Sequence, residues 1–301
     1  MKGNDMNIPT IVPQSPSDIP EELDNTQTAY LGGASIARDR MANEAPLDAE
    51  ALAAVVASDI IVVSGCYDHV ERVLQALEVP YQTVQPGSLA RVDLRPEQLL
   101  VINCPGELTP AEIIKVRDFV AAGGSLFTTD WALRNVIEPA FPGLVEYNDR
   151  STGDDVVGIE VVEADSPYLQ GVLDGADDPQ WWLEGSSYPI RVLDPERVRV
   201  LIRSGELGEK YGECAVAVVF EFGKGEVFHM ISHYYLQRAE LRNDRHAQTA
   251  ESYAMSKGVN FSPGMANAVA DIKLGEVEAA ATSSRLIANI LADKKRRGTK
   301  G

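Results

Sequence analysis

The chain has 301 residues, of which 45% are hydrophobic and 24% are charged, which is typical of a folded protein with one large domain or two small ones. Its 45 acidic and 27 basic residues give a net charge of −18, which argues against non-specific binding to DNA or anionic membranes. The sequence contains no stretch of about 18 apolar residues, so no membrane span is expected.

The cysteines and the N-terminal residues bear on the cellular compartment. Three cysteines without CxxC spacing, Cys66, Cys104 and Cys214, suit a reducing compartment better than a disulfide framework. The first 25 residues contain no apolar segment of the kind found in a secretory signal peptide. We therefore predict a cytoplasmic, acidic protein.

Residues 1–54 form the first predicted region. They are rich in Pro, Ser, Asp and Glu and show little periodicity, which indicates a flexible or partner-ordered arm. A short helix over 47–58 leads from this arm into the core.

A core domain is predicted over residues 55–240. Its elements in chain order are a buried strand at 59–65, a helix at 69–79, a short strand within 80–89, a strand at 98–104, a helix at 109–124, a strand at 125–130 and a short helix at 131–141. Thr109 is a candidate N-cap residue, with Pro110 at the first helical position. Strands alternating with helices through short connections predict a mostly parallel sheet with helices on both faces.

The second half of the core is less regular. Strand-like pieces occur at 156–162, 190–193 and 198–204, and an acidic loop with Trp181 and Trp182 lies between the first two of them. Residues 214–237 predict two strands that are joined by a Gly-Lys-Gly turn.

The region 241–301 is predicted to hold a polar linker and, at 274–297, an amphipathic helix. That helix either packs back on the core or binds a partner. The basic run at its end, which includes Lys294 and Arg297, allows a less favoured alternative in which the protein is a nucleic-acid adaptor.

Chemistry-bearing residues gather where the predicted strands end. Ligands of open α/β sheets bind beyond the carboxyl ends of the strands, and three of the four histidines and two of the three cysteines fall there. The candidate catalytic residues at these ends are Cys66, Asp68, His69, Asp130 and His233, and the candidate ligand-binding residues are Cys104, Glu107, Trp131 and Tyr234.

Four interpretations of these residues remain open. They are a Cys-His hydrolase, a metal site that uses Asp68, His69, Asp130 and His233, a small-ligand pocket without catalysis, and a purely structural role. No metal and no cofactor is predicted from the sequence. The usual phosphate-binding loops, GxGxxG and GxxxxGK[ST], are absent from the sequence.

Two segments, VINCPGELTPAEIIKVRDFVAAGGSLFTTDWA and FGKGEVFHMISH, resemble the class I glutamine amidotransferase-like superfamily. The similarity spans about residues 59–237 and is nearest to non-amidotransferase branches such as the trehalose-utilisation (ThuA-like) proteins. The resemblance implies a flavodoxin-like three-layer α/β sandwich, with the N-terminal arm and the C-terminal helical extension outside it.

The catalytic residues of that superfamily are not all present in this sequence. Its nucleophilic cysteine sits on a tight turn after the strand that corresponds to SLFTT, where this chain has Asp130 and Trp131. The family's catalytic histidine is followed two residues later by glutamate, whereas His233 is followed by Tyr234 and Tyr235. The resemblance therefore argues against glutaminase activity and leaves His233 as the matching position.

From the sequence we predict a non-catalytic amidotransferase-like protein that acts as a binding or scaffold subunit of a cytoplasmic assembly. It would contact a protein partner through the N-terminal arm and the C-terminal helix, with a small-molecule ligand as a second binding partner. The alternative is a hydrolase or sugar-metabolism enzyme with a rearranged site at the strand ends.

Overall fold

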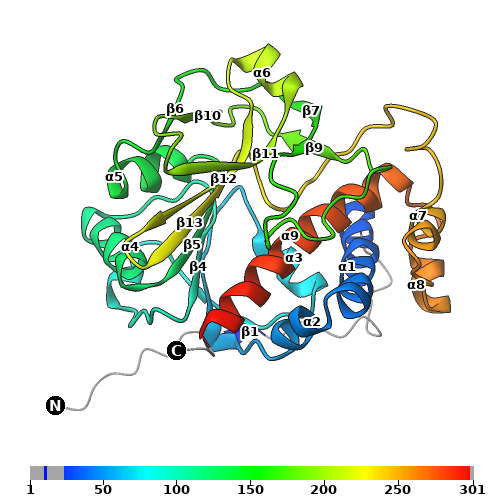
Figure 1. Cartoon of the computed structure of the whole chain (residues 1–301), viewed down its shortest axis with the longest axis horizontal. Helices are drawn as coiled ribbons and strands as arrows, with labels where there is room; N and C mark the ends of the chain where they lie inside the picture. Colours follow the sequence, from blue (N-terminus) through cyan, green and yellow to red (C-terminus); the bar gives the residue numbers. More distant parts are fainter. Residues whose placement is uncertain (1–9, 12–23, 299–301) are drawn as a thin grey trace.

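The computed structural model describes residues 10–11 and 24–298, in which helices surround a central sheet (Figure 1). The strands are β1 (Thr10–Ile11), β2 (Ile60–Val63), β3 (Tyr81–Val84), β4 (Leu99–Ile102), β5 (Ser125–Thr129), β6 (Val145–Tyr147), β7 (Asp155–Gly158), β8 (Glu160–Val161), β9 (Gln180–Leu183), β10 (Ile190–Val192), β11 (Val198–Arg203), β12 (Ala215–Phe222) and β13 (Gly225–Met230). The helices are α1 (Asn25–Glu44), α2 (Pro46–Ala53), α3 (Val70–Ala76), α4 (Pro110–Ala122), α5 (Glu138–Ala140), α6 (Gly205–Tyr211), α7 (Ala250–Ser256), α8 (Pro263–Ala268) and α9 (Leu274–Gly298).

Five parallel strands form the centre of the main sheet, in the spatial order β3-β2-β4-β5-β13. Strands β12, β10 and β6 extend the sheet beyond β13 in antiparallel pairings, as does β1 beyond β3. The α/β class is confirmed, and the predicted parallel arrangement holds for the centre of the sheet. A separate two-stranded sheet pairs β7 with β9.

Local sequence explains the central elements. Strands β2 and β4 are runs of Ile, Leu and Val that are buried along their whole length, as parallel strands between two helical layers must be. Helix α4 begins at a capping box in which the Thr109 side chain accepts a hydrogen bond from the Glu112 backbone and Glu112 reciprocates. Gly223 has a φ of 63° in the predicted turn between β12 and β13.

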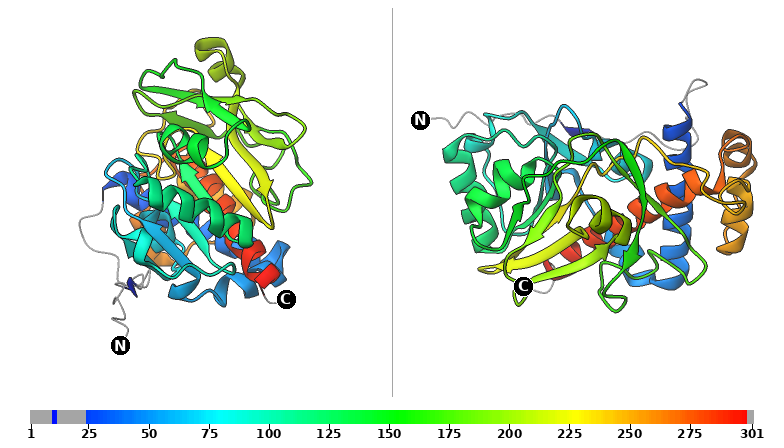
Figure 2. Two further views of the ribbon diagram at one scale, coloured as in Figure 1. Left: turned by 90° about the vertical axis from the view of Figure 1, so that its left-hand side faces the viewer. Right: turned by 90° about the horizontal axis from the view of Figure 1, so that it is seen from above.

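Helices cover both faces of the parallel strands. The right-handed connections of β2 to β3 and of β4 to β5 run in opposite directions along the sheet, so α3 and α4 lie on opposite faces. Helix α9 crosses the same side as α3 and lies beside α1, although the two are far apart in the sequence (Figure 1). Seen from above, α1 and the α7–α8 pair lie together, at the end of the molecule away from α4 (Figure 2). None of the described helices combines the length and apolarity that crossing a membrane requires.

The predicted flexible arm is wrong for residues 25–44, which form α1. Asp24 caps this helix by accepting a hydrogen bond of 2.7 Å from the Gln27 backbone. Gly33 allows α1 to lie directly against α9, because a Cβ atom there would be 2.6 Å from the backbone nitrogen of Ala281. The rest of the predicted arm, residues 1–9 and 12–23, lies outside the described residues.

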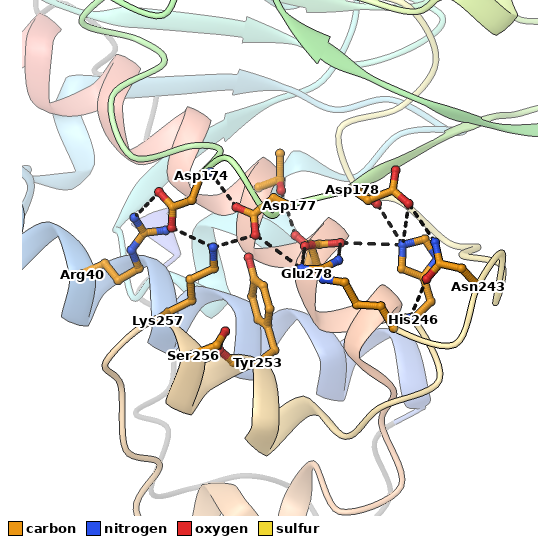
Figure 3. A network of polar contacts seen from close by, with 12 residues as sticks. Arg40, Asp174, Asp177, Asp178, Asn243, His246, Tyr253, Ser256, Lys257 and Glu278 are labelled. Atoms are coloured by element: carbon orange, nitrogen blue, oxygen red, sulfur yellow. Dashed lines mark hydrogen bonds and ion pairs between the residues drawn. The ribbon is translucent and has the colours of Figure 1, made fainter.

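Helix α9 packs back on the core. Its residues from Leu274 to Asp293 are almost all buried, against α1, α2 and α7. A polar network joins it to α1, α7 and the loop before β9 (Figure 3). This network contains Arg40, Asp174, Asp177, Asp178, Asn243, Arg245, His246, Lys257 and Glu278. The apolar face of α9 is therefore buried in the protein itself, whereas the predicted binding of a partner through this helix required that face to be exposed.

Candidate functional site

Four loops bring chemically active side chains together at the carboxyl ends of the parallel strands. Cys104 follows β4, Asp130 follows β5, His233 follows β13 and Glu184 follows β9 of the small sheet. One ligand-type atom each from Cys104, Asp130 and His233 lies within 4.8 Å of the other two, and all three residues are buried. We refer to Cys104, Asp130, Glu184 and His233 as the strand-end cluster.

Asp130 occupies the tight turn after β5. Its φ is 46°, in the left-handed region that non-glycine residues rarely adopt and that is found more often at functional sites. Its carboxylate accepts hydrogen bonds of 2.8 Å from the Tyr188 backbone and 3.1 Å from the Ser187 hydroxyl. Burial raises the pKa of Asp130 to about 7, and the neighbouring His233 together with these hydrogen bonds offsets only part of that effect.

His233 lies between two carboxylates. Its Nδ1 is 2.8 Å from an oxygen of Glu184, and its Nε2 is 3.6 Å from an oxygen of Asp130. The first pair is not aligned as a hydrogen bond and the second is too long for one, so both buried ring nitrogens lack a hydrogen-bond partner. Glu184 is held near the histidine because its backbone N–H donates to the Ser232 hydroxyl at 3.1 Å. The result is a carboxylate–imidazole–carboxylate row that runs from the half-buried Glu184 to the buried Asp130.

Cys104 forms the wall next to Asp130. Burial, reinforced by the negative charge of Asp130, raises the pKa of the Cys104 thiol far above its usual range, which is the opposite of what a free nucleophilic cysteine requires. The loop after β2 lies directly against this residue. A Cβ atom on Gly65 would be 2.2 Å from the Cys104 carbonyl oxygen, so only glycine fits at that position.

Two of the predicted catalytic residues lie beside the cluster without joining it. Asp68 is buried and tied into the fold, because its carboxylate accepts hydrogen bonds from the Thr129 hydroxyl at 2.7 Å and from the Tyr234 backbone at 3.1 Å. His69 is half-buried, and burial together with the charge of Arg72 lowers its pKa. Asp68 therefore ties the loop after β2 to β5 and to the segment after β13.

Three further predicted residues lie away from the cluster. Cys66 and Glu107 are exposed at the ends of their strands. Tyr234 points in the other direction, since its buried hydroxyl donates to the Ser283 carbonyl of α9. The hydroxyl therefore links the segment after β13 to α9, and the ligand contact of Tyr234 stays a prediction.

Trp131 belongs to a row of aromatic side chains next to the cluster. Its ring lies 5.4 Å from that of Tyr67 and 5.6 Å from that of Tyr188, which in turn stacks on Tyr147 at 3.9 Å. The indole N–H of Trp131 donates to the Ser186 carbonyl at 2.7 Å. These four rings are partly exposed, and their faces are suited to contact with a ring of a ligand.

The sequence interpretation missed Glu184, Ser187 and Tyr188. They follow Trp181 and Trp182 in the segment that was interpreted as an acidic loop, which the structure resolves into β9 and a turn. The signal in the sequence was a short apolar run, WWL, followed by EGSS, which is the same pattern of polar residues after a strand that marks the other strand ends. A carboxylate therefore does pair with His233, although it comes from a different strand than in the amidotransferase pattern.

No family model matches the sequence, and no curated protein sequence matches it. Solved structures with partial similarity include a putative GMP synthase component from Thermoplasma acidophilum (TM-score 0.46, 12% identity, covering 80% of this chain and 97% of that chain). Others are a cytoplasmic protein from Salmonella typhimurium (0.41, 11%, 58% and 88%) and an exo-β-1,4-mannosidase from Opitutaceae bacterium strain TAV5 (0.42, 13%, 60% and 32%). The chain thus spans about a third of the mannosidase's length. Similarity at this level does not define a function.

Proposed function

We propose that the protein is a hydrolase whose active site is the strand-end cluster. The observation that carries this proposal is the buried His233 between Glu184 and Asp130, with contact distances of 2.8 and 3.6 Å. An imidazole that is oriented by one carboxylate and faces a second polar group is the arrangement by which enzymes take a proton from water or from a nucleophile.

The position of the site in the fold supports the same proposal. The five parallel strands have the order 2-1-3-4-5 when they are numbered along the chain, and in such sheets ligands bind beyond the carboxyl ends of the strands. We propose a flavodoxin-like layering and an amidotransferase-like ancestry, of the ThuA-like branch, in which Asp130 replaced the thiol on the turn after β5. The aromatic row would hold a substrate ring beside the cluster, as in enzymes that act on sugars or on aromatic esters.

The binding or scaffold function predicted from the sequence is the second candidate. It depended on a lost catalytic set and on two free flanks. Glu184 pairs with His233 and so supplies a carboxylate that the sequence comparison counted as lost. Helices α1 and α9 pack on the core, so most of the two flanks is not free to bind a partner. We therefore place the enzyme proposal ahead of the scaffold proposal.

A hydrolase screen with matched variants tests the proposal. The purified protein is assayed on nitrophenyl esters, acetylated sugars, nitrophenyl glycosides and simple amides. We expect turnover of at least one class, and a loss of about 100-fold or more in kcat/KM for His233→Asn. Glu50→Gln, which changes an exposed carboxylate on α2, serves as the control and should retain full activity. Wild-type turnover that His233→Asn leaves unchanged, or no turnover of any class by the wild type, contradicts the proposal.

A further inference from the structure

Three different ligand types meet inside the strand-end cluster. The thiol of Cys104, the carboxylate of Asp130 and the imidazole of His233 come from three separate loops, and their ligand atoms lie within 4.8 Å of one another. Each of these side chains is almost fully excluded from solvent. A carboxylate and an imidazole are costly to bury, so their meeting beside a thiol in the interior calls for a reason.

The Nε2 atom of His233 supplies an independent observation. It is buried and has no hydrogen-bond partner, and it faces the Asp130 oxygen at 3.6 Å, which is too long for a hydrogen bond. A buried polar atom without a partner destabilises the fold, so its retention calls for a reason. The separation does fit a shared ion, because bonds of about 2.0–2.3 Å to tetrahedral zinc put neighbouring ligand atoms about 3.3–3.8 Å apart.

From this geometry we infer that Cys104, Asp130 and His233 bind one zinc-like divalent transition-metal ion. Glu184 would not bind the ion itself but would contact a ligand of the ion, since its carboxylate lies 2.8 Å from Nδ1 of His233. Metal-bound histidines commonly direct their second nitrogen to a carboxylate, which fixes the ring and strengthens the ligand.

The ligand set selects the class of ion and its role. A thiolate and an imidazole favour zinc and similar transition metals over magnesium or calcium, which prefer oxygen ligands. The charges of one thiolate and one carboxylate balance the 2+ charge of the ion, so the occupied site is neutral. Three protein ligands leave a fourth position for water, which is the pattern of catalytic rather than structural zinc.

This inference rests on the proposed hydrolase function for the role of the ion but not for its binding. In the proposed reaction the ion would bind the attacking water and lower the pKa of that water. His233 would then act as a metal ligand and not as the group that accepts the proton. Metal binding is measured without turnover, so the two proposals fail separately. Binding without hydrolysis would support the metal site and contradict the hydrolase proposal, and hydrolysis by metal-free protein would overturn only the catalytic role of the ion.

Metal content and cobalt spectroscopy test the site. The full chain is purified without a histidine tag and dialysed against zinc or cobalt, and bound metal is measured by elemental analysis. We expect about one equivalent per chain, together with a thiolate-to-cobalt charge-transfer band, because the site holds one ion and one thiolate. Cys104→Ser should lose this band, and His233→Asn should lose the metal.

Matched controls separate the site from adventitious binding. Cys66→Ser and Cys214→Ser remove exposed thiols and should keep both the metal and the band. Glu184→Gln should weaken binding by about 10- to 100-fold while retaining the band, as expected for a residue that acts on the metal through a histidine. Wild-type protein that holds no stoichiometric metal overturns the inference whatever the variants do. A band that Cys104→Ser retains also overturns it.

Discussion

Two buried histidines show the difference between the polar network around α9 and the strand-end cluster. In the network, both ring nitrogens of His246 are used. The Gln180 amide donates to Nδ1 at 2.9 Å, and Nε2 donates to the Asp178 carbonyl at 2.9 Å. In the strand-end cluster, His233 is equally buried and has carboxylates nearby, yet neither of its ring nitrogens makes a hydrogen bond.

The charged groups of the polar network are also paired. The carboxylate of Glu278 is fully buried and receives two hydrogen bonds from Arg245, at 2.5 and 2.9 Å. Asp177 contacts the Lys257 ammonium at 2.6 Å (Figure 3). Pairing of this kind lets charged side chains join α9 and α7 to the loop before β9 at a tolerable cost. In the strand-end cluster, by contrast, no cation donates an aligned hydrogen bond to a carboxylate and both ring nitrogens of His233 lack a hydrogen bond. The proposed chemistry depends on this difference.

The largest expected effect comes from breaking the pairing in the network. Arg245→Met leaves the Glu278 carboxylate buried without its cation, so we expect the free energy of unfolding to fall by about 3–5 kcal/mol. Chemical denaturation at neutral pH measures this change. The double variant Arg245→Met with Glu278→Met removes both charges and should recover most of the loss. A single variant that costs less than about 1 kcal/mol would show that the network contributes little to stability.

His229 tests what happens to a buried imidazole that no carboxylate accompanies. Its Nδ1 lies 2.8 Å from the Thr128 hydroxyl and its Nε2 has no partner, and burial lowers the pKa of His229 to about 3. The unfolded chain binds a proton there near pH 6.5, whereas the folded chain does not until about pH 3. Stability should therefore be lost as the pH falls through this window, by up to about 1.4 kcal/mol per pH unit from this residue.

Denaturation curves between pH 7 and pH 4 measure the contribution of His229. His229→Asn cannot take up a proton, so its stability should depend less steeply on pH than that of the wild type. Thr128→Val removes the bonded hydroxyl but keeps the imidazole, and it should retain the wild-type slope at a lower overall stability. Equal slopes for the wild type and His229→Asn would show that this histidine does not couple folding to pH.

The location of the strand-end cluster could be predicted in part from the sequence. The strand ends are marked by local signals, such as the capping residue Thr109 and the buried β-branched run before Ser64, and these signals placed Cys104, Asp130 and His233 at one edge of the sheet. Parallel strands align their carboxyl ends, so residues that follow different strands meet at one edge of the sheet.

The rest depends on contacts that local patterns do not encode. Glu184 reaches His233 through β9, which pairs with β7 in a small sheet of its own, and no periodicity links the two segments. Helix α1 is buried on several sides and is rich in Ala and Gly, so it shows no apolar stripe of the kind that marks a surface helix. Its position depends on the close approach of Gly33 to Ala281, which is visible only once α9 is in place.

The smallest expected effect on stability is that of Asp130→Asn, the counterpart of the Arg245 variant in the strand-end cluster. Asn has the shape of Asp, and it can still accept from the Tyr188 backbone while its amide donates to the Ser187 hydroxyl or to His233. The variant removes a buried charge that has no aligned hydrogen bond to a cation. We therefore expect the free energy of unfolding, measured in the presence of a chelator, to stay the same or to rise by no more than about 1 kcal/mol. A loss of several kcal/mol, comparable to that of Arg245→Met, would mean that Asp130 stabilises the fold as the network residues do, and the distinction between the two regions would be wrong.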